Sequence, residues 1–203
     1  MARFAGLLTA TLGRWELEKR RLTPEGLEAR KEELRHSVSG RILRIFGVES
    51  LRNGPAPAPA RARLVVANHR AALDIGILLH ELGGIFLSRA DLADWPVVGQ
   101  LASEAGEADV DRDDRRSGAA AIRAVRRRLK AGGSVMIFPE GATFAGDEVQ
   151  PFHAGAFIAA RGLDVEIVPV GLAYPHGVEY VDVSFVEHVE ELARRPHTRV
   201  GIP

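Results

Sequence analysis

The chain has 203 residues, of which 46% are hydrophobic and 27% are charged, which is typical of a globular protein with one sizeable core. It contains no cysteine, which excludes disulfides, thiolate metal sites and a cysteine nucleophile. The basic and acidic side chains number 27 each, so the formal net charge is zero. No apolar run approaches the ~18 residues of a membrane span, and we expect no secretory signal at the N-terminus.

The first predicted element is a short amphipathic helix over residues 2–15. Its apolar side chains share one helical face: Phe4, Leu7, Leu8, Leu12 and Trp15. This face could lie in a membrane interface or pack on the protein itself, and the sequence leaves both open. Residues 1–63 carry a net charge of +6 and the remainder carries −6. This asymmetry indicates contact with an anionic surface, and the lack of nucleic-acid motifs or of a basic stripe interleaved with aromatic residues argues against nucleic acid.

A second helix is predicted from Thr23-Pro24, an N-cap followed by proline, to about Phe46. The alternating proline and alanine residues up to position 60 predict a stiff, extended linker. We therefore expect a helical N-terminal region with its linker over residues 1–60 and an α/β domain over residues 61–203.

Strands and helices alternate beyond the linker. The predicted strands are residues 63–67, 85–88, 107–111, 134–138, 165–173 and 180–186. The predicted helices are residues 74–82, 96–105, 117–131 and 152–161. This order predicts an α/β fold with a mostly parallel central sheet flanked by helices, to which the last strands could add an antiparallel edge.

A polar turn at residues 68–74 interrupts the apolar pattern between a strand and a helix. His69 and Asp74 lie in it, and on one regular helix they would point about 140° apart. They can meet only if the chain bends sharply, with Asn68 or a neighbour capping the next helix. If they meet, Asp74 fixes the tautomer of His69 and leaves its other nitrogen free as a general base. The alternative is a capped helix with an exposed histidine.

A second polar turn follows the predicted strand 134–138. Pro139 cannot continue a central ladder, so Glu140 is presented at the carboxyl end of that strand. Gly141 permits a positive φ or the close approach of a ligand. A turn with a solvated glutamate is the simpler interpretation.

Residues 109–116 form a dense charge cluster. A calcium loop is excluded, because Asp114 and Ala120 stand where glycine and glutamate are required. Arg112 could grip a phosphate with its planar fork of donors, or the segment could be a solvated loop. The chain has no G-x-S-x-G, Walker A, G-x-G-x-x-G or H-E-x-x-H motif, and no ligand cluster implies a metal.

Taken in order, these segments resemble the glycerolipid acyltransferase family, which includes the 1-acylglycerol-3-phosphate acyltransferases. The family's motifs are N-H-x4-D, a P-x-x-G segment, a V-D-R strand end, F-P-E-G and V-P-V. They are matched here by Asn68, His69 and Asp74; Pro96 to Gly99; Asp111 and Arg112; Phe138 to Gly141; and Val168 to Val170. The resemblance spans about residues 64–172.

The resemblance implies transfer of a fatty acyl group from an acyl thioester to the hydroxyl of a lysolipid, without a cofactor. The donor substrate would be acyl-CoA or acyl carrier protein. His69 would deprotonate the hydroxyl and Asp74 would support the imidazolium, so that the oxygen attacks the thioester directly. Four motif residues would bind substrate: Asn68, Arg112, Glu140 and Gly141. Arg89 would join them, because it stands where the family commonly has a lysine before the P-x-x-G segment.

The acceptor is less well defined, because this chain has Thr143 where the family often has arginine after F-P-E-G. The family favours 1-acylglycerol-3-phosphate (lysophosphatidic acid), in phospholipid biosynthesis, and a lyso-ornithine lipid is the alternative. A histidine-dependent thioesterase and a non-catalytic lipid-binding protein are the rivals from other classes. We expect a peripheral position on the cytoplasmic side of a membrane.

Overall fold

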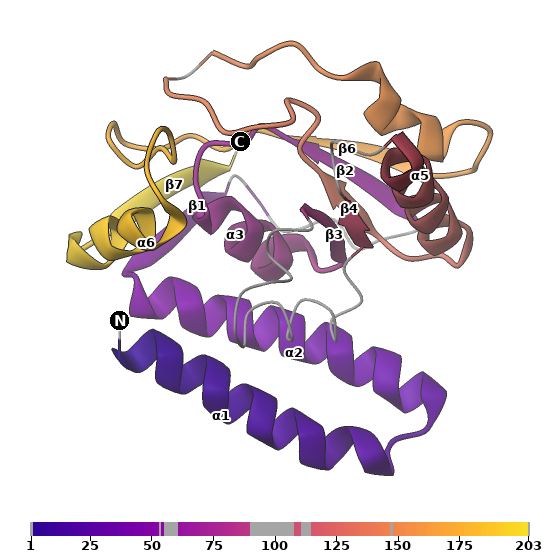
Figure 1. The fold of residues 1–203 in the computed structure, drawn as a ribbon, viewed down its shortest axis with the longest axis horizontal. Coiled ribbons are helices and arrows are strands. Elements are labelled where there is room, and N and C mark those ends of the chain that lie inside the picture. The colour runs from indigo at the N-terminus through magenta and orange to yellow at the C-terminus, as the bar shows by residue number, and fades with distance from the viewer. Residues whose placement is uncertain are drawn as a thin grey trace.

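The computed structural model describes residues 2–52, 54, 61–89, 108–110, 115–146 and 148–202. Within these residues, an α/β body carries a helical hairpin on one side (Figure 1). The predicted fold class is confirmed, because the body contains a parallel sheet with helices on both faces. No helix in this part of the chain combines the length and the hydrophobicity that a bilayer-spanning segment needs.

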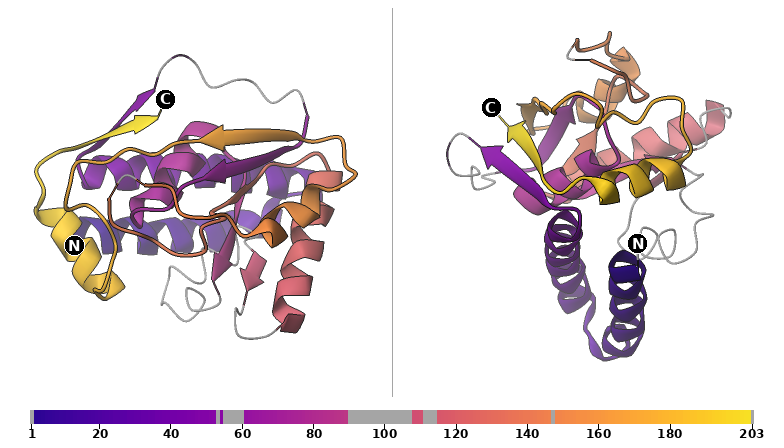
Figure 2. Two further views of the ribbon diagram at one scale, coloured as in Figure 1. Left: turned by 90° about the horizontal axis from the view of Figure 1, so that it is seen from above. Right: turned by 90° about the vertical axis from the view of Figure 1, so that its left-hand side faces the viewer.

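The N-terminal hairpin consists of α1 (Ala2–Glu18), the short 3-10 turn η1 (Lys19–Arg21) and α2 (Pro24–Ile45). α2 begins as predicted, because the Thr23 side chain accepts a hydrogen bond from the backbone N–H of Gly26 and a proline opens the first turn. Figure 2 shows the two helices side by side beneath the body, and α2 is the one that packs against α3 (Leu73–Leu82).

The apolar face of α1 is packed against the protein. Leu7, Leu8 and Trp15 are at most 7% exposed. The ring of Phe4 meets that of Phe46, after the end of α2, edge-on with 5.5 Å between centroids. Of the two interpretations of this helix, the structure favours packing on the protein itself.

The central sheet has five strands in the order β4-β3-β5-β2-β6, and every neighbouring pair is parallel. The strands are β2 (Arg63–Ala67), β3 (Ile85–Arg89), β4 (Ala108–Val110), β5 (Val135–Ile137) and β6 (Glu166–Val170). Each lies within the corresponding predicted strand or differs from it by one residue. The helices α3 and α5 (Arg115–Lys130) confirm the predicted helices 74–82 and 117–131 to within two residues.

The interior strand β2, between β5 and β6, is buried along its whole length, because helices cover both faces of the sheet. Val65 joins the core formed with α2, α3 and α6 (Phe185–Arg194). Leu64 and Val66 join the opposite core, beneath α5 and the 3-10 helix η3 (Ala154–Ala160). Val66 pairs with Ile137 of β5. The two turns that carry the family motifs therefore leave adjacent strands at the same edge of the sheet.

The C-terminal part of the chain differs from the prediction. The strand predicted at residues 180–186 is wrong, since this segment is a loop that ends at the start of α6. Ser184 and Glu187 form a capping box that starts the helix, and this signal outweighs the alternation of apolar residues before it. The helix predicted at residues 152–161 is the shorter η3, and the one predicted at residues 96–105 lies outside the described residues.

Two strands that the sequence analysis did not predict form a small second sheet. β1 (Val48–Arg52) and β7 (Thr198–Ile202) pair in parallel. The expected antiparallel edge is not found among the described strands, where the antiparallel contact is an isolated bridge between Ala173 and Gly201. β1 precedes the predicted linker, so the N-terminal region pairs with the C-terminal end. The division at residue 60 stays a prediction.

Candidate active site

The turn after β2 brings His69 and Asp74 together. The chain leaves the strand after residue 67 and α3 begins only at Leu73, so residues 69–72 form the required bend. Nδ1 of His69 lies 2.7 Å from Oδ2 of Asp74. The predicted contact is therefore confirmed. The predicted side-chain cap is wrong, because Ala72 occupies the N-cap position and makes no side-chain hydrogen bond.

Asp74 is fully buried, and its carboxylate accepts four hydrogen bonds from the residues that the structure describes. Oδ2 accepts from the His69 ring, from the backbone N–H of Arg70 at 2.6 Å and from that of Ala71 at 3.0 Å. Oδ1 accepts from the hydroxyl of Tyr174. Asp74 also lies in the first turn of α3, where the helix dipole favours a negative charge. These contacts compensate a carboxylate that has lost its contact with water.

The imidazole of His69 is fixed on one face and one edge. Its face stacks on Phe138, with 3.9 Å between ring centroids and 6° between ring planes. Its Nδ1 edge is bound to Asp74, while the side chain keeps 19% of its surface exposed. Because Nδ1–H donates to a carboxylate, Nε2 carries the lone pair, and no described residue bonds to it. This nitrogen is placed to accept a proton from a bound molecule.

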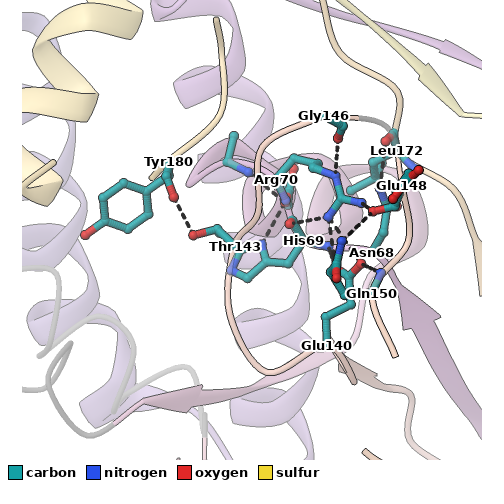
Figure 3. A network of polar contacts seen from close by, with 12 residues as sticks. Asn68, His69, Arg70, Glu140, Thr143, Gly146, Glu148, Gln150, Leu172 and Tyr180 are labelled. Carbon is teal, nitrogen blue, oxygen red and sulfur yellow. Dashed lines mark hydrogen bonds and ion pairs between the residues drawn. The ribbon is translucent and has the colours of Figure 1, made fainter. Parts of the chain in front are cut away.

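A buried ion pair between Arg70 and Glu140 lies beside His69 (Figure 3). Nη1 of Arg70 lies 3.0 Å from Oε2 and 3.2 Å from Oε1 of Glu140, and the two side chains are 3% and 0% exposed. The same carboxylate accepts from the backbone N–H of His69 at 2.6 Å and from that of Gln150 at 2.8 Å. Glu140 therefore joins the turn after β2 to the loop after β5.

The guanidinium of Arg70 makes further bonds to backbone carbonyls on three sides. It donates to the carbonyls of Gly146 at 2.9 Å, Glu148 at 2.6 Å and His69 at 2.8 Å. Figure 3 shows the guanidinium enclosed by these partners. The planar fork of arginine donors is suited to binding a carboxylate and several carbonyls together. The pair thus fixes the backbone of His69 against residues 140–150.

The side-chain amide of Asn68 is bonded to the backbone of Leu172. Its amide nitrogen donates to the carbonyl of Leu172 at 2.9 Å, and its amide oxygen accepts from the Leu172 N–H at 2.7 Å (Figure 3). The side chain ties the end of β2 to the segment after β6. These contacts favour a positioning role for Asn68 over direct contact with substrate, and the same holds for Glu140.

The remaining predicted binding residues are placed only in part. Gly141 adopts the positive φ that its position was predicted to permit, with a value of 83°. Arg112 lies outside the described residues, as does Asp111 before it. Arg89 ends β3, and the structure describes its backbone only. Among the described residues, no group of three or more histidine and acidic side chains could hold a metal ion.

Three side chains at this site were not singled out from the sequence. Arg70 and Tyr174 bond to the motif carboxylates, and the buried His188 accepts a hydrogen bond at Nε2 from the N–H of Ala72, at 3.3 Å. Burial lowers the pKa of His188 below its usual value, which keeps Nε2 available as an acceptor. Of these three, only Arg70 could have been found from the sequence, because it lies inside the N-H-x4-D motif.

Known proteins resemble this chain in both sequence and fold. The family model described as Acyltransferase matches residues 44–173. A 1-acyl-sn-glycerol-3-phosphate acyltransferase of Neisseria gonorrhoeae is 31% identical over 73% of this chain and 54% of its own length. A lyso-ornithine lipid O-acyltransferase of Pseudomonas aeruginosa is 30% identical over 91% of this chain and 72% of its own length.

The solved structure of the 1-acyl-sn-glycerophosphate acyltransferase of Thermotoga maritima has the same fold. The two structures superpose with a TM-score of 0.59 at 19% sequence identity. The match covers 100% of this chain and 84% of the Thermotoga chain. The chain spans about half the length of the first of these relatives, the Neisseria protein. The family model and the relatives, together with the His69–Asp74 pair, show that the chain belongs to the glycerolipid acyltransferase family.

Proposed function

We propose that this protein transfers a fatty acyl group from an acyl thioester to the hydroxyl of a lysolipid. The observation that carries the proposal is the His69–Asp74 pair, with Nδ1 bound to a buried carboxylate and Nε2 without a partner among the described residues. Acyl-CoA or acyl carrier protein is the donor, and the reaction uses no cofactor.

In the proposed reaction, Nε2 of His69 removes the proton from the lysolipid hydroxyl as its oxygen attacks the thioester carbonyl. The negative carboxylate of Asp74 stabilises the imidazolium that forms, at a separation of 2.7 Å. The tetrahedral intermediate then collapses, the carbon–sulfur bond breaks, and the leaving thiolate takes the proton from His69. No covalent bond to the protein is formed in either step.

Direct acceptor contacts are assigned to Arg112, Arg89 and Gly141, while Asn68 and Glu140 position the turns. Arg112 supplies a planar guanidinium for a phosphate. Gly141 follows Glu140 with a positive φ, which removes side-chain bulk where a headgroup could approach the backbone. Glu140 is assigned to the scaffold because its carboxylate is fully buried and bonded to Arg70, His69 and Gln150.

The first choice of acceptor is 1-acylglycerol-3-phosphate, on which the Neisseria relative acts by its name. A lyso-ornithine lipid is the second candidate, favoured by the relative that matches 91% of this chain. Thr143 also favours it, because the hydroxyl that replaces the family's arginine donates to the carbonyl of Tyr180 and supplies no cation.

An acceptor panel tests the proposal. The measurement is thiol release from acyl-CoA with no lysolipid, with 1-acylglycerol-3-phosphate and with a lyso-ornithine lipid. Acyl transfer predicts release that depends on the acceptor, and the faster acceptor identifies the headgroup. Equal release with and without lysolipid would indicate a thioesterase. The same panel is run with acylated carrier protein as the donor, and no thiol release from either donor under any condition would leave a lipid-binding protein.

The proposed lysolipid acceptor implies a membrane partner, and the hairpin offers a surface for it. We place the protein peripherally on the cytoplasmic side of a membrane. A groove of about 480 Å³ between α1 and α2 is lined by Arg3, Gly6, Leu7, Ala10, Arg41, Arg44 and Ile45. The three arginines have no acidic partner among the described residues. Towards the loop end of the hairpin, by contrast, Arg14, Lys19 and Arg30 are paired with glutamates.

Vesicle flotation tests the membrane surface. Each arginine near an anionic bilayer contributes about 1 kcal/mol, so Arg41→Gln with Arg44→Gln should weaken binding roughly 30-fold at low salt. The matched control is Arg194→Gln with Arg199→Gln, which removes two exposed charges far from the hairpin in sequence. Equal binding by both double variants would contradict the placement.

A further inference from the structure

The two oxygens of the Asp74 carboxylate are used unequally. Oδ2 accepts from three donors, all within the turn at residues 69–71. Among the described residues, Oδ1 has one partner, the hydroxyl of Tyr174, which is 100 residues away in sequence. Without that hydroxyl, a fully buried carboxylate oxygen would have no hydrogen bond. The proposed mechanism gives Tyr174 no task.

The backbone around Tyr174 is held on both sides. Leu172 is bonded through both of its backbone groups to the side chain of Asn68. Ala173 exchanges hydrogen bonds with Gly201 of β7, at 3.1 Å and 3.0 Å. The tyrosine ring itself packs against the core that contains α3 and α6. The hydroxyl therefore reaches Asp74 from a fixed backbone, which is what a positioning contact requires.

We propose that Tyr174 is a positioning residue. By donating a hydrogen bond to Oδ1, its hydroxyl fixes the orientation of the Asp74 carboxylate and stabilises part of its negative charge. The carboxylate in turn holds His69 in the orientation that a general base needs. The inference rests on the proposed acyl transfer, because it assigns a task within that reaction. Tyr174 acts through Asp74 and does not contact the reacting atoms.

The hydroxyl of Tyr174 stays protonated at neutral pH and well above it. Burial, and then the neighbouring charge of Asp74, raises the pKa of Tyr174 well above its usual value of 10. A protonated phenol beside a carboxylate can only donate to it. Tyr174 is therefore a constant donor to Oδ1, and its removal changes the dyad at every working pH.

The two tyrosines of the chain provide a matched pair of variants. Tyr174→Phe removes the hydroxyl and keeps the ring in the core. Tyr180→Phe is the control, because the Tyr180 hydroxyl has no hydrogen-bond partner among the described residues, and its ring stacks on His188 with 4.9 Å between centroids. Thermal melting of both variants shows whether each remains folded.

We expect Tyr174→Phe to lower kcat by about 10- to 100-fold, the equivalent of one hydrogen bond to a charged group. KM for both substrates should change by less than about twofold. The acid limb of the pH profile should move to higher pH, because a carboxylate with one donor fewer holds the imidazolium more tightly. Tyr180→Phe should match the wild type in all three. A folded Tyr174→Phe variant with wild-type kcat and an unshifted acid limb overturns the inference.

A second measurement separates this inference from the proposed function. The titration of the His69 ring is followed by NMR in the wild type and in Tyr174→Phe, with the signal assigned by its loss in His69→Gln. If the wild type lacks acyltransferase activity, the proposed function fails. The positioning contact is then still tested, since it predicts a higher His69 pKa in Tyr174→Phe and no change in Tyr180→Phe. Identical titrations in all three proteins refute it.

Discussion

Replacing Glu140 by glutamine tests whether the buried ion pair supports the site. The substitution preserves shape but removes the charge that compensates Arg70, whose side chain is 3% exposed. It also replaces one carboxylate oxygen by an amide NH2 group. Each oxygen of Glu140 accepts hydrogen bonds from Arg70 and from a backbone N–H, and the NH2 group cannot accept them. Breaking a buried pair by neutralising one partner costs about 3–5 kcal/mol.

For a chain of this length, 1 kcal/mol corresponds to a shift of about 2–4 °C in Tm. We therefore expect Glu140→Gln to melt about 6–20 °C below the wild type, followed by circular dichroism and checked by urea unfolding. The control is Glu148→Gln, the same change at an exposed glutamate whose backbone carbonyl, and not its side chain, binds Arg70. Its free energy of unfolding should stay within about 0.5 kcal/mol of the wild type.

The double variant Arg70→Met with Glu140→Gln sharpens the test. Removing both charges abolishes the uncompensated charge, so the double variant should be more stable than the sum of the single losses predicts. A Glu140→Gln protein as stable as Glu148→Gln would refute the role of this pair in holding the two turns together.

Three further predictions concern the acceptor, the hairpin and pH. Arg112→Ala should raise KM for 1-acylglycerol-3-phosphate about tenfold or more and leave KM for acyl-CoA nearly unchanged, as steady-state kinetics would show; equal losses for both substrates would point to a structural role. Trp15→Ala should lower the free energy of unfolding by about 3–5 kcal/mol, because this side chain is buried, whereas Leu17→Ala, at a side chain that is 70% exposed, should change it little; a large drop in vesicle binding without loss of stability would place α1 in the membrane instead. Because the pKa of His188 is lowered in the folded protein, the unfolded chain binds more protons, and stability should fall as pH drops below the usual value of 6.5. Urea unfolding at pH 5 and pH 7 measures this loss of stability, and the loss should be smaller in His188→Gln. The same difference in unfolding free energy between the two pH values in both proteins would argue against the role of His188.

The parts of the site that lie close together in sequence could be predicted from it. His69 and Asp74 are separated by one bend between a strand and a helix, so the contact follows once the bend is assumed. Gly141 likewise adopts the backbone conformation that its neighbours require. In both cases the deciding interactions lie within a few residues.

The partners of these residues could not be predicted, because they depend on which strands are neighbours. Arg70 and Glu140 are 70 residues apart in sequence. They meet because β2 and β5 are neighbouring strands, with Val66 of β2 beside Ile137 of β5. Tyr174 reaches Asp74 across 100 residues because β6 lies on the other side of β2. Periodicity in one sequence gives the strands but not their order. For this reason Asn68 and Glu140 were predicted to bind substrate, although their side chains bond to Leu172 and Arg70 of the protein itself.

The C-terminal errors have a local cause. Alternating apolar residues near position 183 predicted a strand, although Ser184 and Glu187 already carried the capping-box signature of a helix start. The strands β1 and β7 were not predicted because β1 is at most half-buried, and because β7 contains Gly201, a residue type that is depleted in strands. Short strands of this kind are stabilised by their pairing rather than by a distinctive sequence pattern.

The most direct test of the central claim is acceptor-dependent thiol release by wild type, His69→Ala and Asp74→Asn, measured side by side on folded protein. A general base held by a buried carboxylate predicts a loss of about 10²–10⁴-fold in kcat for His69→Ala. Asp74→Asn should also lose most of its activity, because an amide cannot stabilise the imidazolium. Near-wild-type rates in folded His69→Ala protein would contradict the mechanism, whatever the acceptor.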